Sequence, residues 1–236
     1  MKKLALISLI GIAAMSLTAC TKSLSKEKFA PVLDDVTAKI ASECTNVHIN
    51  NRLSVTTYNY KEGEFYSFKT FFTVILITTD QYDHVWSQDG EYYHATRSKI
   101  NGVGSESCDK ITKEQFDSLL AAGKAKVQEE LMKPVDSAKA MMSEVVEGYT
   151  SIKNSYEYNS MDKIYKMTSK TTYEAASSKD PEQKVQAEKT FIYSFKNSLP
   201  TSFKTKDKKE GKTSTEEWKY SYGKAEFTRP DVCPAA

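Results

Sequence analysis

Three observations on the sequence predict an α+β fold, in which helices pack on antiparallel sheet. Apolar residues recur at helical spacing over 30–43 and over 113–148, whereas 47–99 and 152–228 have the pattern of strands separated by polar turns. Helix and strands thus occur twice in the same order. Aromatic motifs repeat with them, since YNYKEGEFYSF and WSQDGEYY in the first half are matched by YEYNSMDKIYKM and WKYSYGKAEF in the second. We expect two helix-plus-four-strand units, 29–110 and 111–236, which an internal duplication would explain.

The first unit is expected to open with a helix over about 30–43, with Pro31 in its first turn. Its apolar face is formed by Phe29, Val32, Leu33, Val36 and Ile40. Polar turns then divide Val47 to Lys99 into four antiparallel strands. The run FFTVILITT at 71–79 is apolar on both faces, which predicts a central strand. The glycine and serine segment NGVGSES at 101–107 is expected to be a loop that ends the unit.

The hairpin around 89–90 decides whether two of the three histidines can meet. A two-residue Asp-Gly loop pairs Val85 with His94 and puts His84 and His94 on opposite faces of the sheet. A three-residue loop would instead place His84 directly opposite His94, within reach of one metal ion. Asp-Gly favours the two-residue loop, so we expect no metal site and no cofactor.

The second unit is expected to begin with two helices. Thr112 is a predicted N-cap and Gln115 completes a capping box before an apolar stripe. Pro134 should divide that stripe into helices over 113–132 and 135–148. Strands are expected at about 152–159, 163–175, 188–197 and 216–228. The lysine-rich segment KTKDKKEGK at 204–212 should be a solvated loop.

Aromatic side chains are concentrated in the segment 58–93. Tyrosine hydroxyls prefer water or a polar partner, so tyrosines that alternate along strands suggest a sheet face lined by amphipathic rings. We take Tyr66, Tyr92 and Tyr93 as the candidate ligand-binding residues. Such a surface suits a protein partner, a glycan or an acyl chain. A packed aromatic core with tyrosines at its rim is the structural alternative.

The N-terminus has the pattern of a secretory signal peptide. Lysines precede an uncharged apolar run over 4–17, shorter than the roughly 20 residues that a membrane-spanning helix needs. The run ends in Leu17-Thr18-Ala19-Cys20, which resembles the lipobox of bacterial lipoproteins. The resemblance implies a signal peptide over 1–19 and a lipidated tether over 20–28, with acyl chains such as palmitate on Cys20 holding the protein at a membrane.

The same resemblance implies a location in the cell envelope. Thr21 follows the lipidated cysteine, and in bacteria with two membranes this implies transport to the outer membrane. Processing would remove two of the 33 basic residues, leaving 31 against 31 acidic ones. Balanced charge argues against a nucleic-acid partner and leaves the acyl anchor as the membrane contact.

Three cysteines remain after Cys20, and an exported protein lives where disulfides form. We therefore expect one disulfide and one unpaired cysteine, although the sequence alone leaves the pairing open. We expect Cys44 to pair with Cys108, because the two bracket the first predicted sheet. Cys233 would then be the leftover thiol.

The chain lacks the motifs of common enzymes. It has no Gly-x-Ser-x-Gly elbow, no His-Glu-x-x-His pair and no Walker loop, and GVGSES lacks the third glycine of a dinucleotide fingerprint. We therefore expect no enzyme and no catalytic residues. The first functional hypothesis is a non-catalytic envelope module that binds a protein or glycan through the tyrosine-rich sheet.

The alternative is a lipid carrier or chaperone with an apolar cavity. The segment DKIYKMTS at 162–169 resembles strands of the lipid-carrier half-barrels found among envelope lipoproteins. That resemblance implies a different fold, in which one curved antiparallel sheet wraps helices over an acyl cavity.

Overall fold

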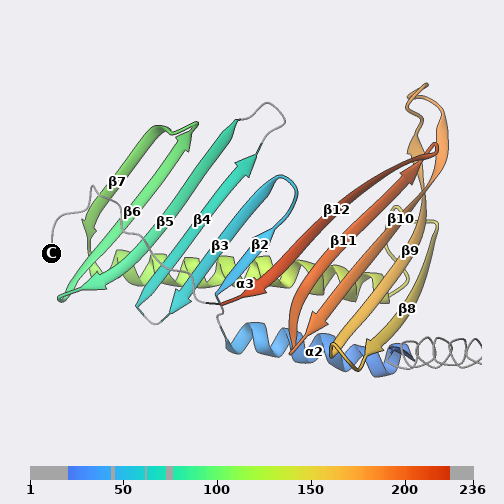
Figure 1. Cartoon of the computed structure of the whole chain (residues 1–236), viewed down its shortest axis with the longest axis horizontal. Helices are drawn as coiled ribbons and strands as arrows, with labels where there is room; N and C mark the ends of the chain where they lie inside the picture. Colours follow the sequence, from blue (N-terminus) through green and yellow to red (C-terminus); the bar gives the residue numbers. More distant parts are fainter. Residues whose placement is uncertain (1–20, 44–45, 62, 73–76, 224–236) are drawn as a thin grey trace, which may run out of the picture.

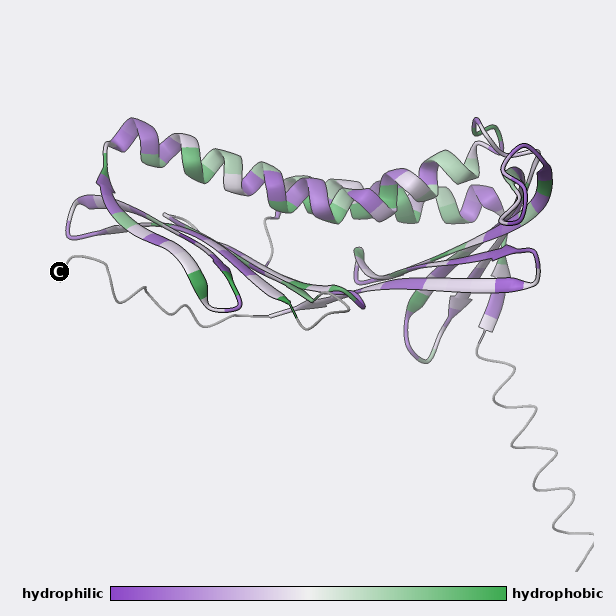
Figure 2. Cartoon of the chain, turned by 90° about the horizontal axis from the view of Figure 1, so that it is seen from above, coloured by the Kyte–Doolittle hydropathy of each residue, from purple (hydrophilic) through white to green (hydrophobic). Residues whose placement is uncertain are grey.

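In the residues that the structure describes, the fold is one antiparallel sheet of twelve strands, with two helices on one of its faces (Figures 1 and 2). The structure is a computed structural model that describes residues 21–43, 46–61, 63–72 and 77–223. The strand order is β1-β8-β9-β10-β11-β12-β2-β3-β4-β5-β6-β7. The helices are α2 (Lys26–Ser42) and α3 (Lys113–Met142). The strands are β1 (Thr21–Leu24), β2 (Val47–Asn50), β3 (Ser54–Lys61), β4 (Glu64–Phe72), β5 (Thr78–Gln88), β6 (Glu91–Ile100), β7 (Val103–Ile111), β8 (Ser151–Asn159), β9 (Ile164–Ala176), β10 (Lys184–Lys196), β11 (Leu199–Lys209) and β12 (Lys212–Tyr222).

The predicted α+β fold of two helix-plus-four-strand units is wrong, because a single sheet dominates the structure. The two halves join edge to edge through β12 and β2, where Tyr222 pairs with Val47. An isolated unit would leave both strands with open hydrogen-bonding edges, and their pairing satisfies these edges. The alternative fold expected from sequence, one curved sheet beneath helices, is closer to what Figure 2 shows.

The segments around the two predicted units are also organised differently from the expectation. The stretch 20–28 was expected to be a tether, but Thr21–Leu24 form β1 on β8 and α2 begins at Lys26. The expected boundary at 110 falls where β7 gives way to α3. Residues of α3 contact strands from both halves of the sheet, so this helix ties the halves together.

Helix α3 starts as the sequence predicts but continues through the predicted break. The Gln115 backbone N–H donates to Thr112 Oγ1 over 3.3 Å, and the Thr112 N–H donates to Gln115 Oε1 over 2.9 Å, which confirms the capping box. Pro134 lies inside the helix and is buried. A proline costs a helix interior about 3 kcal/mol. Complete burial of the flanking apolar residues offsets that cost, with Leu131 1% exposed and Val135 0%.

Three segments, one predicted as a strand and two as loops, instead belong to hairpins. Phe72 pairs with Thr78, so the chain reverses within 71–79 and the single central strand expected there is wrong. The expected loop at 101–107 is a turn at Asn101-Gly102, both with positive φ, followed by β7. In the expected lysine-rich loop, β11 continues to Lys209 before it turns into β12. Asn101 and Gly102 in the second turn, and Glu210 and Gly211 in the third, have the positive φ that tight hairpins require.

The hairpin at 89–90 has the predicted two-residue loop. Asp89 and Gly90 both have positive φ, at 53° and 80°, as a type I′ turn requires. Val85 pairs with His94, and the two histidines therefore face opposite sides of the sheet as expected. Among the described residues, no three His, Cys, Asp or Glu side chains gather as a possible metal site.

Apolar packing occurs on both faces of the sheet. The inner face, which carries the helices, holds the main core; it includes Phe29 and Leu33 of α2, Val127 and Leu131 of α3, and Tyr193 of β10. A second cluster on the outer face consists of Tyr82, Trp86 and Ala95, packed against Tyr66, Phe68, Tyr93 and Cys108. In the described part of the chain, no helix is long and apolar enough to cross a bilayer.

Candidate functional site

A groove runs between α3 and the inner face of the sheet, where the two halves of the sheet meet. It contains two neighbouring cavities of about 300 and 340 Å³. Both are lined by Thr56 of β3, Lys69 of β4 and Glu130 of α3, so the cavities are adjoining parts of one groove. Strand β12 pairs with the whole of β2 through Lys219–Tyr222, and the rest of β12 leans away from the β2–β3 hairpin (Figure 1).

The floor of the groove follows from strand periodicity. Alternate residues of a strand point to the same face, so Thr56 and Tyr58 of β3 both face α3, as do Ser67 and Lys69 of β4. At the β12 side the floor is aromatic and apolar, with Ile49, Phe203, Trp218 and Tyr220. At the β5 and β6 side it is polar, with Gln81, Asp83 and Thr96. The groove is therefore amphipathic along its length.

An aromatic ladder leads into the apolar end of the groove. Phe203 lies opposite Tyr193 on one neighbouring strand and opposite Trp218 on the other. The ring of Phe203 stacks on both, with centroid distances of 5.1 Å to each. The buried Tyr193 hydroxyl lies 2.8 Å from Ser137 Oγ, which ties the ladder to α3. Cross-strand aromatic pairs of this kind stiffen a sheet and hold the rings in fixed positions.

The tyrosine hydroxyls of the groove stay neutral. Burial raises the pKa of Tyr58 and of Tyr220, and the nearby Glu130 carboxylate raises both further. These groups therefore act as neutral hydrogen-bonding side chains across the physiological pH range.

Three lysines border the groove. Lys133 forms an ion pair with Glu130 over 2.7 Å. Lys69 Nζ instead lies 4.4 Å from the centre of the Phe71 ring, and Lys126 Nζ lies 6.0 Å from that of Tyr58. Within the described residues, neither Lys69 nor Lys126 has a carboxylate partner. The groove therefore has two positive charges available for an anion.

These groove residues could not be predicted from the sequence, because they come together only when α3 crosses β3 and β4. The available signal was on α3 alone, where Lys126, Glu130 and Lys133 are three and four residues apart and share one helical face. Nothing in the sequence showed which strands that face would meet.

The predicted site residues Tyr66, Tyr92 and Tyr93 lie on different faces. Tyr92 is on the inner face, where its ring lies 4.7 Å from that of Phe116 in α3. Tyr93 and Tyr66 are on the outer face, and Tyr93 stacks on Trp86 at 5.4 Å. A further cavity of about 460 Å³ lies beside His94 and the start of α3, and Tyr92 does not line it. The three tyrosines do not form one surface.

The outer face holds a continuous row of rings on β4, β5 and β6. Tyr66 lies 5.8 Å from Tyr82 and 5.5 Å from His84, and His84 lies 4.5 Å from Trp86. Trp86 and His84 are almost fully buried, with 3% and 0% of their surface exposed. The row is thus packed as a core, which is the structural alternative named for these aromatics.

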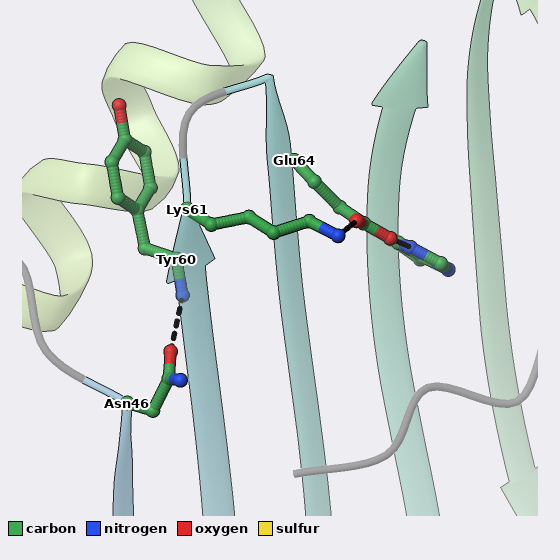
Figure 3. A network of polar contacts seen from close by, with 5 residues as sticks. Asn46, Tyr60, Lys61 and Glu64 are labelled. Carbon is green, nitrogen blue, oxygen red and sulfur yellow. Dashed lines mark hydrogen bonds and ion pairs between the residues drawn. The ribbon is translucent and has the colours of Figure 1, made fainter. Parts of the chain in front are cut away.

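A polar network borders this row (Figure 3). Lys61 forms an ion pair with Glu64, and Glu64 Oε1 lies 2.8 Å from His84 Nε2. Burial would raise the pKa of Glu64, but the hydrogen bonds and charges of Lys61 and His84 together hold it below its ordinary value. In the same view, Asn46 Oδ1 accepts a hydrogen bond from the Tyr60 backbone N–H over 3.2 Å. This bond fixes the start of β2 beside the end of β3.

The cysteine predictions fall largely outside the described residues. Cys20, the predicted lipidation site, and Cys44 both lie outside them, as does Cys233. Cys108 lies on β7, opposite Ala95. Lipidation of Cys20 and the pairing of Cys44 with Cys108 remain predictions.

Comparison with known proteins gives no family. No protein-family model matches the chain, and no curated protein matches it. Among solved structures, the chain is similar to LprF from Mycobacterium bovis, with 10% identity, a TM-score of 0.30 and coverage of 89% of this chain and 99% of that one. A DNA polymerase sliding clamp from Pseudomonas aeruginosa shows 8% identity, a TM-score of 0.14 and coverage of 89% and 66%. At such TM-scores neither likeness supports a conclusion about function.

Proposed function

We propose that this protein is a non-enzymatic carrier for an acidic amphiphile, a molecule with an acyl chain and a carboxylate or phosphate group. The observation that carries the proposal is the groove beneath α3, in which an aromatic floor lies beside Lys69 and Lys126, neither of which forms an ion pair with a carboxylate of the described residues. The acyl chain would lie along the aromatic end, and the anionic group would lie near Lys69 and Lys126.

The size and chemistry of the groove support this assignment. Pockets for small ligands have volumes of about 300–1,000 Å³ and combine an apolar lining with a few placed polar groups. The two cavities of about 300 and 340 Å³ adjoin and together fall within that range. An ammonium beside an aromatic wall binds an anion more strongly than one in open water, since the local dielectric constant is lower.

The proposal includes the membrane anchor predicted from the lipobox. Acyl chains on Cys20 would hold the protein in the cell envelope, at the outer membrane where the organism has one. Thr21 pairs with Asn159 at the start of β1, so the anchored end would lie beside the outermost strands of the second half. A carrier held at a membrane in this way could exchange its ligand with the lipid beside it.

The carrier fits the geometry better than the protein- or glycan-binding module that was our first hypothesis. That hypothesis needs Tyr66, Tyr92 and Tyr93 on one accessible surface. Tyr92 packs against Phe116 on the inner face, and Tyr93 stacks on Trp86 on the outer one. The tyrosine-rich binding surface stays a prediction, and single Tyr→Ala changes with a pull-down from envelope extract test it.

Binding of a fluorescent fatty-acid analogue tests the carrier directly. The protein with Cys20 replaced by alanine should bind the analogue, and its native mass spectrum should show lipid retained from the producing cell. Lys69→Gln combined with Lys126→Gln should weaken binding about tenfold, because it removes two charge interactions of roughly 0.7 kcal/mol each. The matched control is Lys170→Gln, which changes an exposed lysine of β9 outside the groove.

A second variant tests the apolar half of the groove. Thr56→Phe places a ring where the two cavities adjoin and should abolish binding while circular dichroism stays unchanged. Equal affinity in the wild type, the lysine double variant and the Thr56→Phe variant would rule out this groove as the binding site. A ligand-free mass for the wild type, with no uptake of the analogue, would rule out the carrier.

A further inference from the structure

The outer face of the second half of the sheet, β8–β12, is polar and rich in lysine. The helices lie on the other face (Figure 2). Phe203 and Trp218 line the groove on that inner face, so the strand residues that alternate with them point outward. On the outer face, paired residues form one row across five strands, which we call the basic row: Lys153, Lys170, Thr190, Lys206 and Thr215. The row spans four strand spacings, about 19 Å.

The lysines of the basic row have no carboxylate beside them. All three are exposed, and in the described part of the chain none of them forms an ion pair. Three glutamates of the same face pair with other lysines, as Glu157–Lys166, Glu174–Lys184 and Glu217–Lys204. Glu188, which lies opposite Lys208, is an exposed carboxylate close to the row. The row itself is a continuous strip of positive charge.

Two of these lysines repel each other across the sheet. Lys153 on β8 and Lys170 on β9 lie directly opposite one another. Like charges at opposed positions destabilise a sheet. The outward pairs on either side, Ser151–Thr172 and Ser155–Thr168, are neutral. Stability of the sheet therefore does not explain the two lysines, whereas an anionic partner would offset their repulsion.

The anchored end of the chain opens onto the same face. Cys20, the predicted lipidation site, directly precedes Thr21. Thr21 lines a cavity of about 300 Å³ together with Glu157, Lys166 and Ser194, which are outward residues paired in one row. That row is four residues along the strands from the basic row, which corresponds to about 13 Å. Acyl chains on Cys20 would therefore enter a membrane close to the basic row.

We propose that the basic row docks on an anionic phospholipid leaflet, at the surface of the membrane that holds the acyl chains. Lysine ammonium groups and threonine hydroxyls both donate hydrogen bonds to phosphate oxygens. The negative potential of such a leaflet attracts lysines within a Debye length, about 8–10 Å. Met161, in the turn that follows β8, is 68% exposed and would add an apolar contact with lipid at the anchored end.

The balanced net charge of the processed chain predicts no such contact. Net charge says nothing, however, about how the charges are distributed over the surface. Here, exposed lysines without carboxylate partners in the described residues gather on one face of the sheet. Docking through this face goes beyond the carrier proposal, because it shares with it only the predicted anchor and uses none of the groove residues.

Vesicle co-sedimentation tests the docking without the acyl anchor. The Cys20→Ala protein should bind vesicles made of phosphatidylglycerol and phosphatidylcholine at low ionic strength. It should bind them far less at high ionic strength, where the charges are screened, and should not bind vesicles of phosphatidylcholine alone. Each lysine close to an anionic surface strengthens binding about fivefold. Lys153→Gln, Lys170→Gln and Lys206→Gln combined should therefore weaken binding about a hundredfold.

Three further variants separate charge on this face from other causes. Arginine at all three lysines of the row keeps the charge and should bind as the wild type does. Lys26→Gln, Lys28→Gln and Lys113→Gln combined remove the same charge from the helices of the inner face and should leave binding almost unchanged. Glu188→Gln removes the carboxylate close to the row and should strengthen binding about fivefold.

Lysine acetylation tests the orientation in the full-length protein. On anionic vesicles, Lys153, Lys170 and Lys206 should react severalfold more slowly than in the Cys20→Ala protein in solution, while Lys113 should react equally in both. Equal acetylation of the row lysines in the two samples would overturn the proposal, as would equal vesicle binding by the wild type and the glutamine triple variant. Binding to a soluble polyanion but not to vesicles would also overturn it and would assign the row to an acidic polymer.

The result is independent of the carrier proposal. Lys69→Gln combined with Lys126→Gln changes the groove alone and should leave vesicle binding unchanged. The glutamine triple variant of the basic row should still bind the fluorescent fatty-acid analogue. Each proposal can therefore fail without the other.

Discussion

Replacement of Gly123 by alanine tests how α3 is seated on the sheet. Gly123 is buried where α3 crosses β4, and the ring of Phe65 packs directly against its Cα. A Cβ at position 123 would lie 2.6 Å from both Cδ1 and Cδ2 of that ring. Carbon atoms prefer separations of about 3.5–4.0 Å, so the added methyl overlaps the ring by roughly 1 Å.

Two opposing effects set the size of the loss. Alanine is favoured over glycine inside a helix by about 1 kcal/mol. Overpacking of a close-packed core costs about 1–3 kcal/mol, and the severity of this overlap places it at the upper end. The free energy of unfolding should therefore fall by about 2 kcal/mol. With an m-value of about 3 kcal/mol/M, the urea midpoint should fall by about 0.7 M.

Two further variants separate sterics from helix propensity. Ala122→Gly changes an exposed neighbour on the same helix and should cost about 1 kcal/mol, which calibrates the propensity difference. Phe65→Leu in the Gly123→Ala background should remove much of the overlap, so the double variant should lose less than the sum of the single losses by about 1 kcal/mol. A Gly123→Ala protein as stable as the wild type, or more stable, would refute the view that α3 needs glycine at position 123 to pack against Phe65.

Three other changes test single contacts. Thr112→Ala removes half of the capping box and should lower the free energy of unfolding by about 1 kcal/mol in urea titrations; an unchanged midpoint would mean that water replaces the cap. Tyr193→Phe removes the hydroxyl that lies 2.8 Å from Ser137 Oγ and should cost about 1 kcal/mol in the same assay, with Tyr158→Phe as control. Hydrogen bonds from Ser177 and Ser178 lower the pKa of Glu210 to about 2 from 4.5, so the carboxylate stabilises the fold above pH 4.5 and loses this effect as the pH falls toward 2. The stability gap between wild type and Glu210→Gln should close over that window, and a gap independent of pH would contradict this assignment.

Local signals in the sequence predicted local structure well. The capping box at Thr112 and the turn at Asp89-Gly90 each depend on residues a few positions apart, and both occur as predicted. The turn also fixed the β5–β6 register and hence the separation of the histidines. Such features are set by backbone conformation and short-range hydrogen bonds, which the rest of the chain does not alter.

Long-range features could not be predicted in the same way. The pairing of β12 with β2 joins residues about 170 positions apart, and no pattern in either strand names its partner. The continuation of α3 through Pro134 likewise depends on the core that surrounds Leu131 and Val135. The low helix propensity of Pro134 is outweighed by the tertiary packing around it. The groove lysines were missed for the same reason, since a helix and two strands must meet before they share a site.

One part of the predicted site conflicted with the periodicity of strands. Tyr92 and Tyr93 are consecutive, and consecutive residues of a strand point to opposite faces. The alternation alone therefore assigns Tyr92 to the face of His94 and Tyr93 to that of Ala95. On the inner face, Tyr92 meets Phe116 at the start of α3. On the outer face, Tyr93 packs against the cluster of Tyr82, Trp86 and Ala95.

The same alternation gives the two faces of the sheet different roles. In β4, Phe65, Ser67 and Lys69 face α3, where Phe65 seats the helix and the other two line the groove. Tyr66 and Phe68, between them, face the outer cluster. A shift of β4 by one residue would turn Lys69 away from the groove and Tyr66 toward the helix. Burial of rings on the outer face thus helps to hold the register on which the inner groove depends.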